Sequence, residues 1–124
     1  MTIAARYGAE QYCYLTTTGR VSGLPREIEI WFAARDNTIY MLAGSGVNSH
    51  WVMNILQRPA VTVRIDETVF SGTGRLVESD EEASAIRPLL AVKYQGWTPD
   101  KPLSAWARTA LPVAIDLEAE MATH

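Results

Sequence analysis

Residues 12–34 read YCYLTTTGRVSGLPREIEIWFAA, and this stretch decides the fold. Aromatic and β-branched residues fill positions 12–18, which favours a strand. Positions 19–24 hold two glycines and a serine, a composition typical of a turn. Apolar and polar residues then alternate from Arg26 to Ala34, which predicts a second strand and hence an antiparallel hairpin. One face of that strand would carry Ile28, Ile30 and Phe32, and the other Glu27, Glu29 and Trp31.

The rest of the chain continues as strands with helices between them. Alternating or β-branched residues predict further strands at 38–43, 61–65, 68–77 and 111–117. Helices are predicted from Asn48 or Ser49 to about 57, from a cap at Asp80 to about 92, and as a short turn at 104–107. These elements predict a mainly β, α+β fold: six antiparallel strands in a small, partly closed β-barrel whose closure hides the sheet edges.

Three local features refine this prediction. Gly72 and Gly74 within one strand indicate a β-bulge or a close approach of another part of the chain. Pro88 predicts a kink or an early end of the second helix, so that residues 94–102 form a loop. The small, polar tail after Glu118 is expected to fray.

Length and composition exclude several classes of protein. The chain has 124 residues, 48% of them apolar, so we expect one domain over 1–124 with its core in 12–117. Eleven basic against fourteen acidic residues give a net charge of −3, which disfavours nucleic acid as a partner. One cysteine, Cys13, expected to be buried, and two histidines, His50 and His124, argue against a metal centre.

The same composition bears on location. No apolar run approaches the roughly 20 residues that span a bilayer, so we expect no membrane span. Glu10 and polar tyrosines lie where a signal peptide would be apolar, so we expect a cytoplasmic protein.

The turn at 19–24 and its flanks are a candidate anion site. Hydroxyl groups, two glycines and two arginines fall within 16–26, among them Thr18, Arg20, Ser22 and Arg26. Glycines let backbone amides approach a ligand, and arginine forms charge-assisted hydrogen bonds with phosphate or carboxylate. The alternative is an ordinary turn, because turns are rich in glycine and serine.

Two further stretches are candidates for ligand contact. Residues 44–46 (GSG) lead into a helix N-terminus, which favours an anion, and the helix carries Trp51 and Asn54. Trp51 fits a place in the core better than contact with a ligand, whereas Asn54 needs a polar partner, either backbone or cofactor. Aromatic residues in and beside the later loop could stack on a planar ligand or simply pack under a C-terminal flap. These are Tyr94, Trp97 and Trp106.

Residues 15–26 (LTTTGRVSGLPR) resemble the LTTxGRx[ST]GxPR signature of the deazaflavin-dependent nitroreductase family. Residues 51–59 (WVMNILQRP) resemble the WxxNLxxxP helix of that family, and 61–63, 94–97 and 108–113 resemble its later parts. The resemblance spans about 12–117. It implies a split β-barrel related to pyridoxamine-phosphate oxidase, binding of reduced coenzyme F420, and hydride transfer to a quinone, nitroaromatic or other activated acceptor, a small molecule.

The resemblance also implies roles for individual residues. Ser22 and Arg26 would hold the phosphate and acidic tail of F420, and 43–46 would approach the deazaflavin ring. The implied cofactor-binding set is Thr18, Arg20, Ser22, Arg26, Ala43, Gly44, Ser45, Gly46, Trp51 and Asn54. The implied acceptor-side set is Trp31, Tyr94, Trp97 and Trp106. Ser45, Tyr94 or solvent would donate the proton.

The sequence departs from the family pattern at two positions and leaves alternatives open. Val21 and Ser45 stand where many members carry lysine, which removes positive charge from the predicted anion site. FMN, with its single phosphate, is therefore an alternative cofactor, and a non-catalytic module for flavin, haem or lipid is a further one. Split barrels commonly bind cofactor at a dimer interface, so a homodimer is also expected, through the face with Glu27, Glu29 and Trp31.

Overall fold

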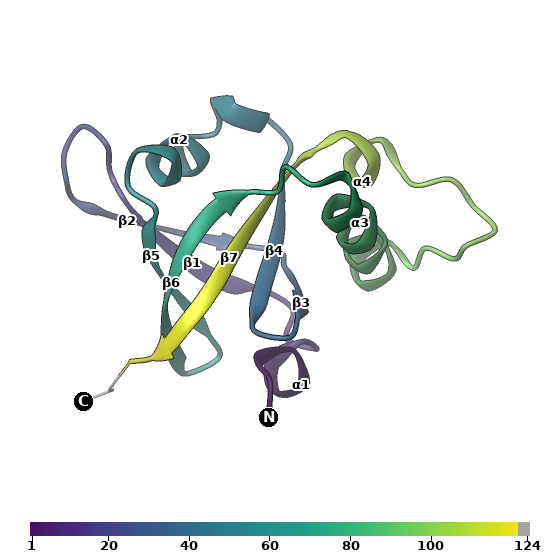
Figure 1. The fold of residues 1–124 in the computed structure, drawn as a ribbon, viewed down its shortest axis with the longest axis horizontal. Helices are drawn as coiled ribbons and strands as arrows, with labels where there is room; N and C mark the ends of the chain where they lie inside the picture. The colour runs from purple at the N-terminus through teal and green to yellow at the C-terminus, as the bar shows by residue number, and fades with distance from the viewer. Residues whose placement is uncertain (122–124) are drawn as a thin grey trace.

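The computed structural model describes residues 1–121, and its centre is one antiparallel sheet of seven strands (Figure 1). The strands lie in the order β2-β1-β5-β6-β7-β4-β3. Their bounds are β1 Cys13–Thr18, β2 Pro25–Ile30, β3 Ala33–Arg35, β4 Thr38–Ala43, β5 Ala60–Ile65, β6 Thr68–Leu76 and β7 Leu111–Glu120. β1 pairs with β2 in the register Thr18↔Pro25 to Cys13↔Ile30, so the predicted hairpin at 12–34 is present.

The structure has seven strands and not the predicted six, because the strand expected at 26–34 is divided at Trp31 and Phe32. The backbone N–H of Phe32 donates to the hydroxyl of Tyr94, 2.9 Å away, and its carbonyl accepts from Nζ of Lys93 at 2.8 Å. Side chains of a helix therefore take the hydrogen bonds that a continuous strand would give to a neighbouring strand. As a result, β2 and β3 lie at opposite edges of the sheet, and the residues between them connect these edges.

The helices differ from the predictions in extent more than in number. α2 (His50–Gln57) follows a short 3₁₀ turn, η1 (Gly46–Asn48), and α4 spans Ala105–Thr109. α3 runs over Asp80–Gln95, past Pro88, and is capped by Ser79 and not by Asp80. Its end at Gly96, where φ is +61°, places Tyr94 in a helix and not in the predicted loop.

Both ends of the chain are more regular than predicted. The sequence analysis missed α1 (Ile3–Tyr7), whose first amide donates to Oδ1 of Asn37 at 3.0 Å. β7 continues to Glu120, which pairs with Phe70, so the expected fraying after Glu118 is wrong up to that residue. Residues 122–124 of the predicted tail, including His124, lie outside the described residues.

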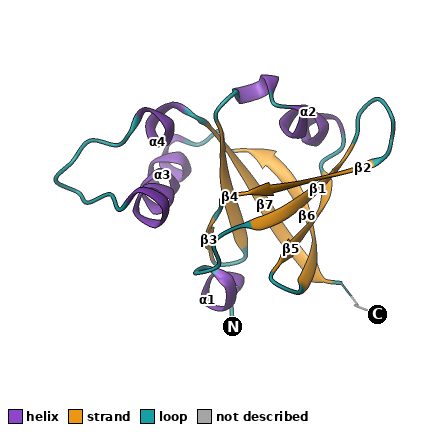
Figure 2. Cartoon of the chain, turned by 180° about the vertical axis from the view of Figure 1, so that it is seen from behind, coloured by secondary structure: helices purple, strands orange, loops and turns teal. Residues whose placement is uncertain are grey.

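Helices cover different parts of the sheet (Figures 1 and 2). α2 lies across one end of the half-barrel, beside the β1–β2 loop, whereas α3 and α4 lie together at the side of β3 and β4. A Cβ on Gly74 of β6 would lie 2.7 Å from Cγ2 of Ile55, so glycine is required for α2 to pack against the sheet. The predicted bulge and close approach are therefore confirmed, since the β6–β7 register also shifts between Ser71 and Gly72.

Two apolar clusters result from this arrangement. The larger fills the half-barrel with residues such as Leu15, Ile39, Ile55 and Ile115, and the smaller lies under α3 and α4. Cys13 is fully buried in the larger cluster, and burial raises the pKa of its thiol to about 12, as expected for a structural cysteine. No helix within residues 1–121 is both long and apolar enough to cross a membrane.

Candidate functional site

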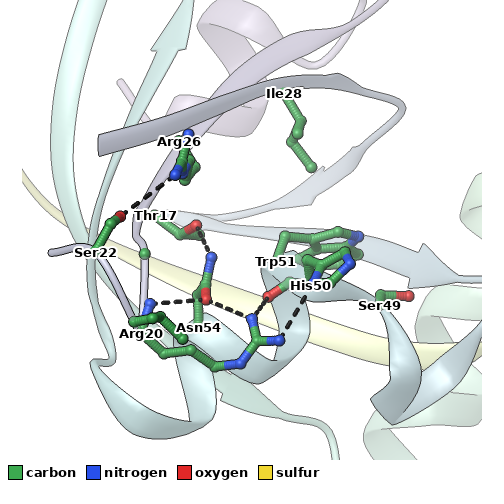
Figure 3. A pocket seen from close by; sticks show the side chains of 11 residues that line it. Thr17, Arg20, Ser22, Arg26, Ile28, Ser49, His50, Trp51 and Asn54 are labelled. Carbon is green, nitrogen blue, oxygen red and sulfur yellow. Dashed lines mark hydrogen bonds between the residues drawn. The ribbon is translucent and has the colours of Figure 1, made fainter. Parts of the chain in front are cut away.

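A cavity of about 780 Å³ lies between the β1–β2 loop, β2 and the first turn of α2 (Figure 3). It is lined by Thr17, Gly19, Arg20, Val21, Ser22, Arg26, Ile28, Ser49, His50, Trp51 and Asn54. Two guanidinium groups and an imidazole contribute to this lining, and no carboxylate does. The potential in the cavity is therefore positive, which suits an anionic ligand.

The β1–β2 loop is folded by its glycines. The amide of Gly19 donates to the carbonyl of Leu24 at 2.8 Å, and the amide of Gly23 donates to the carbonyl of Gly19, also at 2.8 Å. A Cβ on Gly19 would lie 2.8 Å from Oγ of Ser22, so any side chain at this position would displace the serine. Gly23 has φ of +73°, a region that favours glycine. The loop therefore holds Ser22 over the cavity because positions 19 and 23 carry no side chain.

Asn54 connects this loop to α2. Its side chain is 3% exposed, and Oδ1 accepts from both the backbone N–H of Arg20 at 3.1 Å and Nη1 of Arg20 at 2.9 Å. Its Nδ2 donates to Oγ1 of Thr17 at 3.1 Å. The polar partner that the sequence required is thus the β1–β2 hairpin itself. Asn54 holds the wall of the cavity in place, and its own polar atoms are occupied.

The two arginines of the cavity have different surroundings. Arg20 reaches along α2, where Nη2 lies 3.2 Å from Nδ1 of His50 in addition to the contacts with Asn54. Arg26 is exposed, and within residues 1–121 its one side-chain hydrogen bond runs from Nη2 to Oγ of Ser22 at 3.3 Å. Neither arginine forms an ion pair with a carboxylate within residues 1–121. Arg26 and Ser22 are therefore the groups of the cavity best able to turn toward an anion.

The N-terminus of α2 adds to this positive potential. Ser49 is the N-cap residue by position, yet its hydroxyl makes no capping hydrogen bond and lines the cavity instead. The first turn of the helix holds no acidic residue. The positive end of the helix dipole therefore lies at the cavity wall without a neutralising side chain.

A second, smaller cavity of about 270 Å³ lies where β2 ends, and it has aromatic walls. It is lined by Glu29, Ile30, Trp31, Leu42 and Trp106. The rings of Trp31 and Tyr94 stack at 4.4 Å with an interplanar angle of 2°, and Trp106 meets Trp31 edge-on at 5.8 Å. Trp31 and Trp106 offer aromatic surface to a planar molecule, and Glu29 places a carboxylate in the same wall.

Tyr94 holds the aromatic wall in place. Its hydroxyl lies 2.7 Å from the carbonyl of Gln11 and 2.9 Å from both the carbonyl and the amide of Phe32. Burial raises the pKa of Tyr94 to about 12. A hydroxyl with backbone partners and a raised pKa suits positioning of Trp31 better than proton donation. Trp97 lies apart from this group, and its Nε1 donates to the carbonyl of Lys101.

The predicted site residues thus divide into three groups. Arg20, Ser22, Arg26, Trp51 and Asn54 come together in the larger cavity, and Trp31 and Trp106 line the smaller one. Thr18 and residues 43–46 line neither cavity: Ala43 is buried in the core, and Gly44 and Ser45 are exposed beyond the end of β4.

Six further residues line the larger cavity without having been named individually as site residues from the sequence, although all but Ile28 lie within the two candidate stretches, 16–26 and 44–54: Thr17, Gly19, Val21, Ile28, Ser49 and His50. The alternation of buried Cys13 and Leu15 along β1 is a signal that could have found Thr17, the next inward position. The predicted helix N-terminus pointed to the position of His50, but its contact with Arg20, 30 residues away, was not visible in the sequence.

Comparison with known proteins gives one family match. The family described as F420H(2)-dependent quinone reductase matches residues 2–118, nearly the whole chain.

Solved structures with the same fold include a conserved hypothetical protein of Mycobacterium tuberculosis. It is 21% identical, with a TM-score of 0.78, over 97% of this chain and 82% of that one. A structure named F420-H2 dependent reductase is 22% identical with a TM-score of 0.65, over 85% and 93% of the two chains. A Listeria innocua protein assigned as a pyridoxamine 5′-phosphate oxidase is 17% identical with a TM-score of 0.66, over 90% and 86%. These likenesses confirm the predicted split β-barrel, with seven strands in place of six.

Proposed function

This chain belongs to the F420H2-dependent quinone reductase family, and from that premise we propose that its larger cavity holds the anionic part of F420 while the smaller one receives a quinone. The family makes the protein an F420-dependent reductase, as predicted. The alternative cofactor FMN, suggested by the absence of lysine at Val21 and Ser45, gains no support from the family match. The observation that carries the proposal is a cavity with two arginines and no carboxylate.

The residues present fit an anionic cofactor. Arg26 and Ser22 bind phosphate or carboxylate oxygens, and Arg20 and the N-terminus of α2 supply further positive potential. Val21 lines the cavity but is 95% exposed, and Ser45 lies outside it, so the positive charge of this site comes from Arg20, Arg26 and the N-terminus of α2 and not from a lysine at either position. Asn54 contributes indirectly, by fixing the loop against α2.

The remaining residues prepare the reaction that the cofactor makes possible. When bound, reduced F420 supplies a hydride. Trp51 and Ile28 form the apolar wall of the larger cavity, where they exclude water and contact a planar ring. In the smaller cavity, Trp31 and Trp106 contact the planar acceptor. Ser45 lines neither cavity, so in this proposal solvent donates the proton.

The experiment is a fluorescence titration of the purified protein with F420 and, in parallel, with FMN. We expect tight binding of F420 and weak or no binding of FMN. Oxidation of F420H2 is then followed with a benzoquinone and with a nitrobenzene of similar size. Faster turnover of the quinone supports the proposal, and turnover of the nitroarene alone would replace the quinone by a nitroaromatic acceptor. Absence of F420 binding would refute the proposed site.

We also propose that a second copy of the chain covers the exposed edge of β2, which carries Glu27 and Glu29 and leads to Trp31. An unpaired edge strand is a common place for self-association. Sedimentation velocity distinguishes a monomer from a dimer, and substitution of Glu27 by lysine is expected to weaken the dimer.

A further inference from the structure

His50 has a role that neither the motif nor the family assigns. It is the first residue of α2, it is exposed, and it lines the larger cavity beside Arg20 (Figure 3). Nη2 of Arg20 lies 3.2 Å from Nδ1 of His50, within hydrogen-bond distance. The contact joins the β1–β2 loop to the helix at the mouth of the cavity.

The chemistry of this contact fixes the tautomer of His50. A guanidinium group can only donate hydrogen bonds, so Nδ1 must be the acceptor. The neutral ring then carries its proton on Nε2, and Nε2 has no hydrogen-bond partner within residues 1–121. A protonated ring would instead point an N–H at the guanidinium. Arg20 therefore selects the form of His50 that presents a hydrogen-bond donor at Nε2.

We propose that His50 is a direct ligand of the anionic part of F420, through Nε2–H, and that Arg20 is the residue that positions it. The inference rests on the proposed function and adds a third anion ligand to Arg26 and Ser22. Arg20 thereby acts twice: through Asn54 it holds the loop, and through Nδ1 it leaves Nε2–H as the free donor of a ring that lines the cavity.

The test uses two substitutions with different chemistry. His50→Gln keeps an acceptor for Arg20 and a donor for the ligand, whereas His50→Leu removes both. We expect His50→Leu to weaken F420 binding by about tenfold or more, as for the loss of one hydrogen bond to a charged group, and His50→Gln to stay within about threefold of the unsubstituted protein. Circular dichroism and thermal unfolding confirm that both variants are folded.

A second readout does not depend on activity or on the variants. Nitrogen NMR of the uniformly ¹⁵N-labelled, tag-free protein reports which ring nitrogen of His50 carries the proton, and a His124→Gln variant assigns the two histidines. We expect an unprotonated Nδ1 without ligand, and a shift of the His50 signals when F420 or inorganic phosphate is added. A proton on Nδ1, or unchanged F420 affinity in folded His50→Leu, would overturn the inference.

Failure of the proposed function is separable from failure of this inference. If the unsubstituted protein does not bind F420, the proposed function is wrong, and the phosphate titration alone decides the role of His50. Shifted ring signals with phosphate then support an anion ligand at His50, and unshifted signals refute it.

Discussion

Two groups of arginines in this molecule differ in what surrounds them. Arg75 of β6 lies between two carboxylates: Nη1 and Nη2 each donate to Glu82 at 2.8 Å, and Nε donates to Asp116 at 2.7 Å. Arg20 and Arg26, at the cavity, have no carboxylate partner within residues 1–121. The difference teaches which charges stabilise the fold and which remain available for a ligand.

The carboxylates around Arg75 join separate parts of the chain. Glu82 belongs to α3 and also accepts from the hydroxyl of Tyr40 on β4 at 2.7 Å. Asp116 belongs to β7 and accepts from Oγ1 of Thr38 at 2.9 Å. The network therefore fixes α3 against the sheet, and none of its residues lines the larger cavity. At the cavity, Arg20 hydrogen-bonds Asn54 and Arg26 hydrogen-bonds Ser22. These neutral partners orient the guanidinium groups and leave their charge available to a ligand.

The largest effect is expected for Arg75→Ala. Loss of four charge-assisted hydrogen bonds leaves Glu82 and Asp116 without their cation. We therefore expect the free energy of unfolding to fall by about 2 kcal/mol, a value reduced from that of a buried pair because these groups are partly exposed. Denaturant unfolding measures this loss, and F420 affinity should not change. Arg108→Ala, an exposed arginine of α4, is the control. Equal stability of the two variants would break the comparison.

Arg26→Ala is expected to do the opposite. In the described part of the chain its guanidinium hydrogen-bonds Ser22 alone, so removal should leave the unfolding temperature unchanged while F420 affinity falls by about tenfold, or about 1.4 kcal/mol. Fluorescence titration measures the affinity. Arg26→Lys keeps the charge and loses the planar fork, so its affinity should lie between the two. A folded Arg26→Ala protein with unchanged F420 affinity would remove Arg26 from the site.

The comparison also shows what the sequence could predict. The hairpin, the alternation along β5 to β7 and the α2 stripe are local patterns, and each appears where it was expected. The turn residues 19–24 likewise carry their own signals, since glycine is needed at both 19 and 23. These features depend on neighbours within a few positions, which a sequence displays directly.

What the sequence could not predict depends on distant partners. The division of the strand at Trp31 requires Tyr94, 62 residues further along the chain, to bond the backbone of Phe32. Asn54 was assigned to the cofactor by motif, yet its partners Arg20 and Thr17 lie 34 and 37 residues away. Pro88 predicts a kink or an early end of its helix, whereas α3 continues past it to Gln95, with Ile86 and Leu90 packed in the core on either side.

Acid titration sharpens the comparison at the paired arginine. Hydrogen bonds from Arg75 and Tyr40 lower the pKa of Glu82 from 4.5 to about 2. Because the folded pKa is the lower one, the unfolded chain binds more protons in this range, and the stability contributed above pH 4.5 is lost as the pH falls toward 2. Unfolding by urea at pH 6 to 3 should show this loss. The slope should be shallower in Arg75→Ala, and an unchanged slope would contradict the assignment.

Lys93 gives the smallest expected effect, and it is a third kind of cation. It forms no ion pair in the described chain; its ammonium donates to the carbonyl of Phe32 and lies 3.9 Å from the centre of the Phe32 ring. Burial lowers the pKa of Lys93 from 10.5 to about 8. Between these values the unfolded chain binds more protons than the folded one, so this lysine makes stability rise as the pH increases from 8 to 10.5.

Substitution of Lys93 by methionine tests this directly. The variant keeps the length of the side chain and has no charge to bury, so at pH 7 we expect its stability to differ by less than about 1 kcal/mol. From pH 8 upward, the free energy of unfolding of the unsubstituted protein should rise relative to that of the Lys93→Met variant. The titration of Cys13 acts in the opposite direction because burial raises its pKa. Since Cys13 and Lys93 interact electrostatically, the two proteins are compared below pH 9.0, the ordinary pKa of the thiol. A pH-independent difference would mean that Lys93 is as well solvated in the folded chain as in the unfolded one. A partly buried cation without a carboxylate partner would then cost no folding free energy at Lys93, just as none is expected at Arg26.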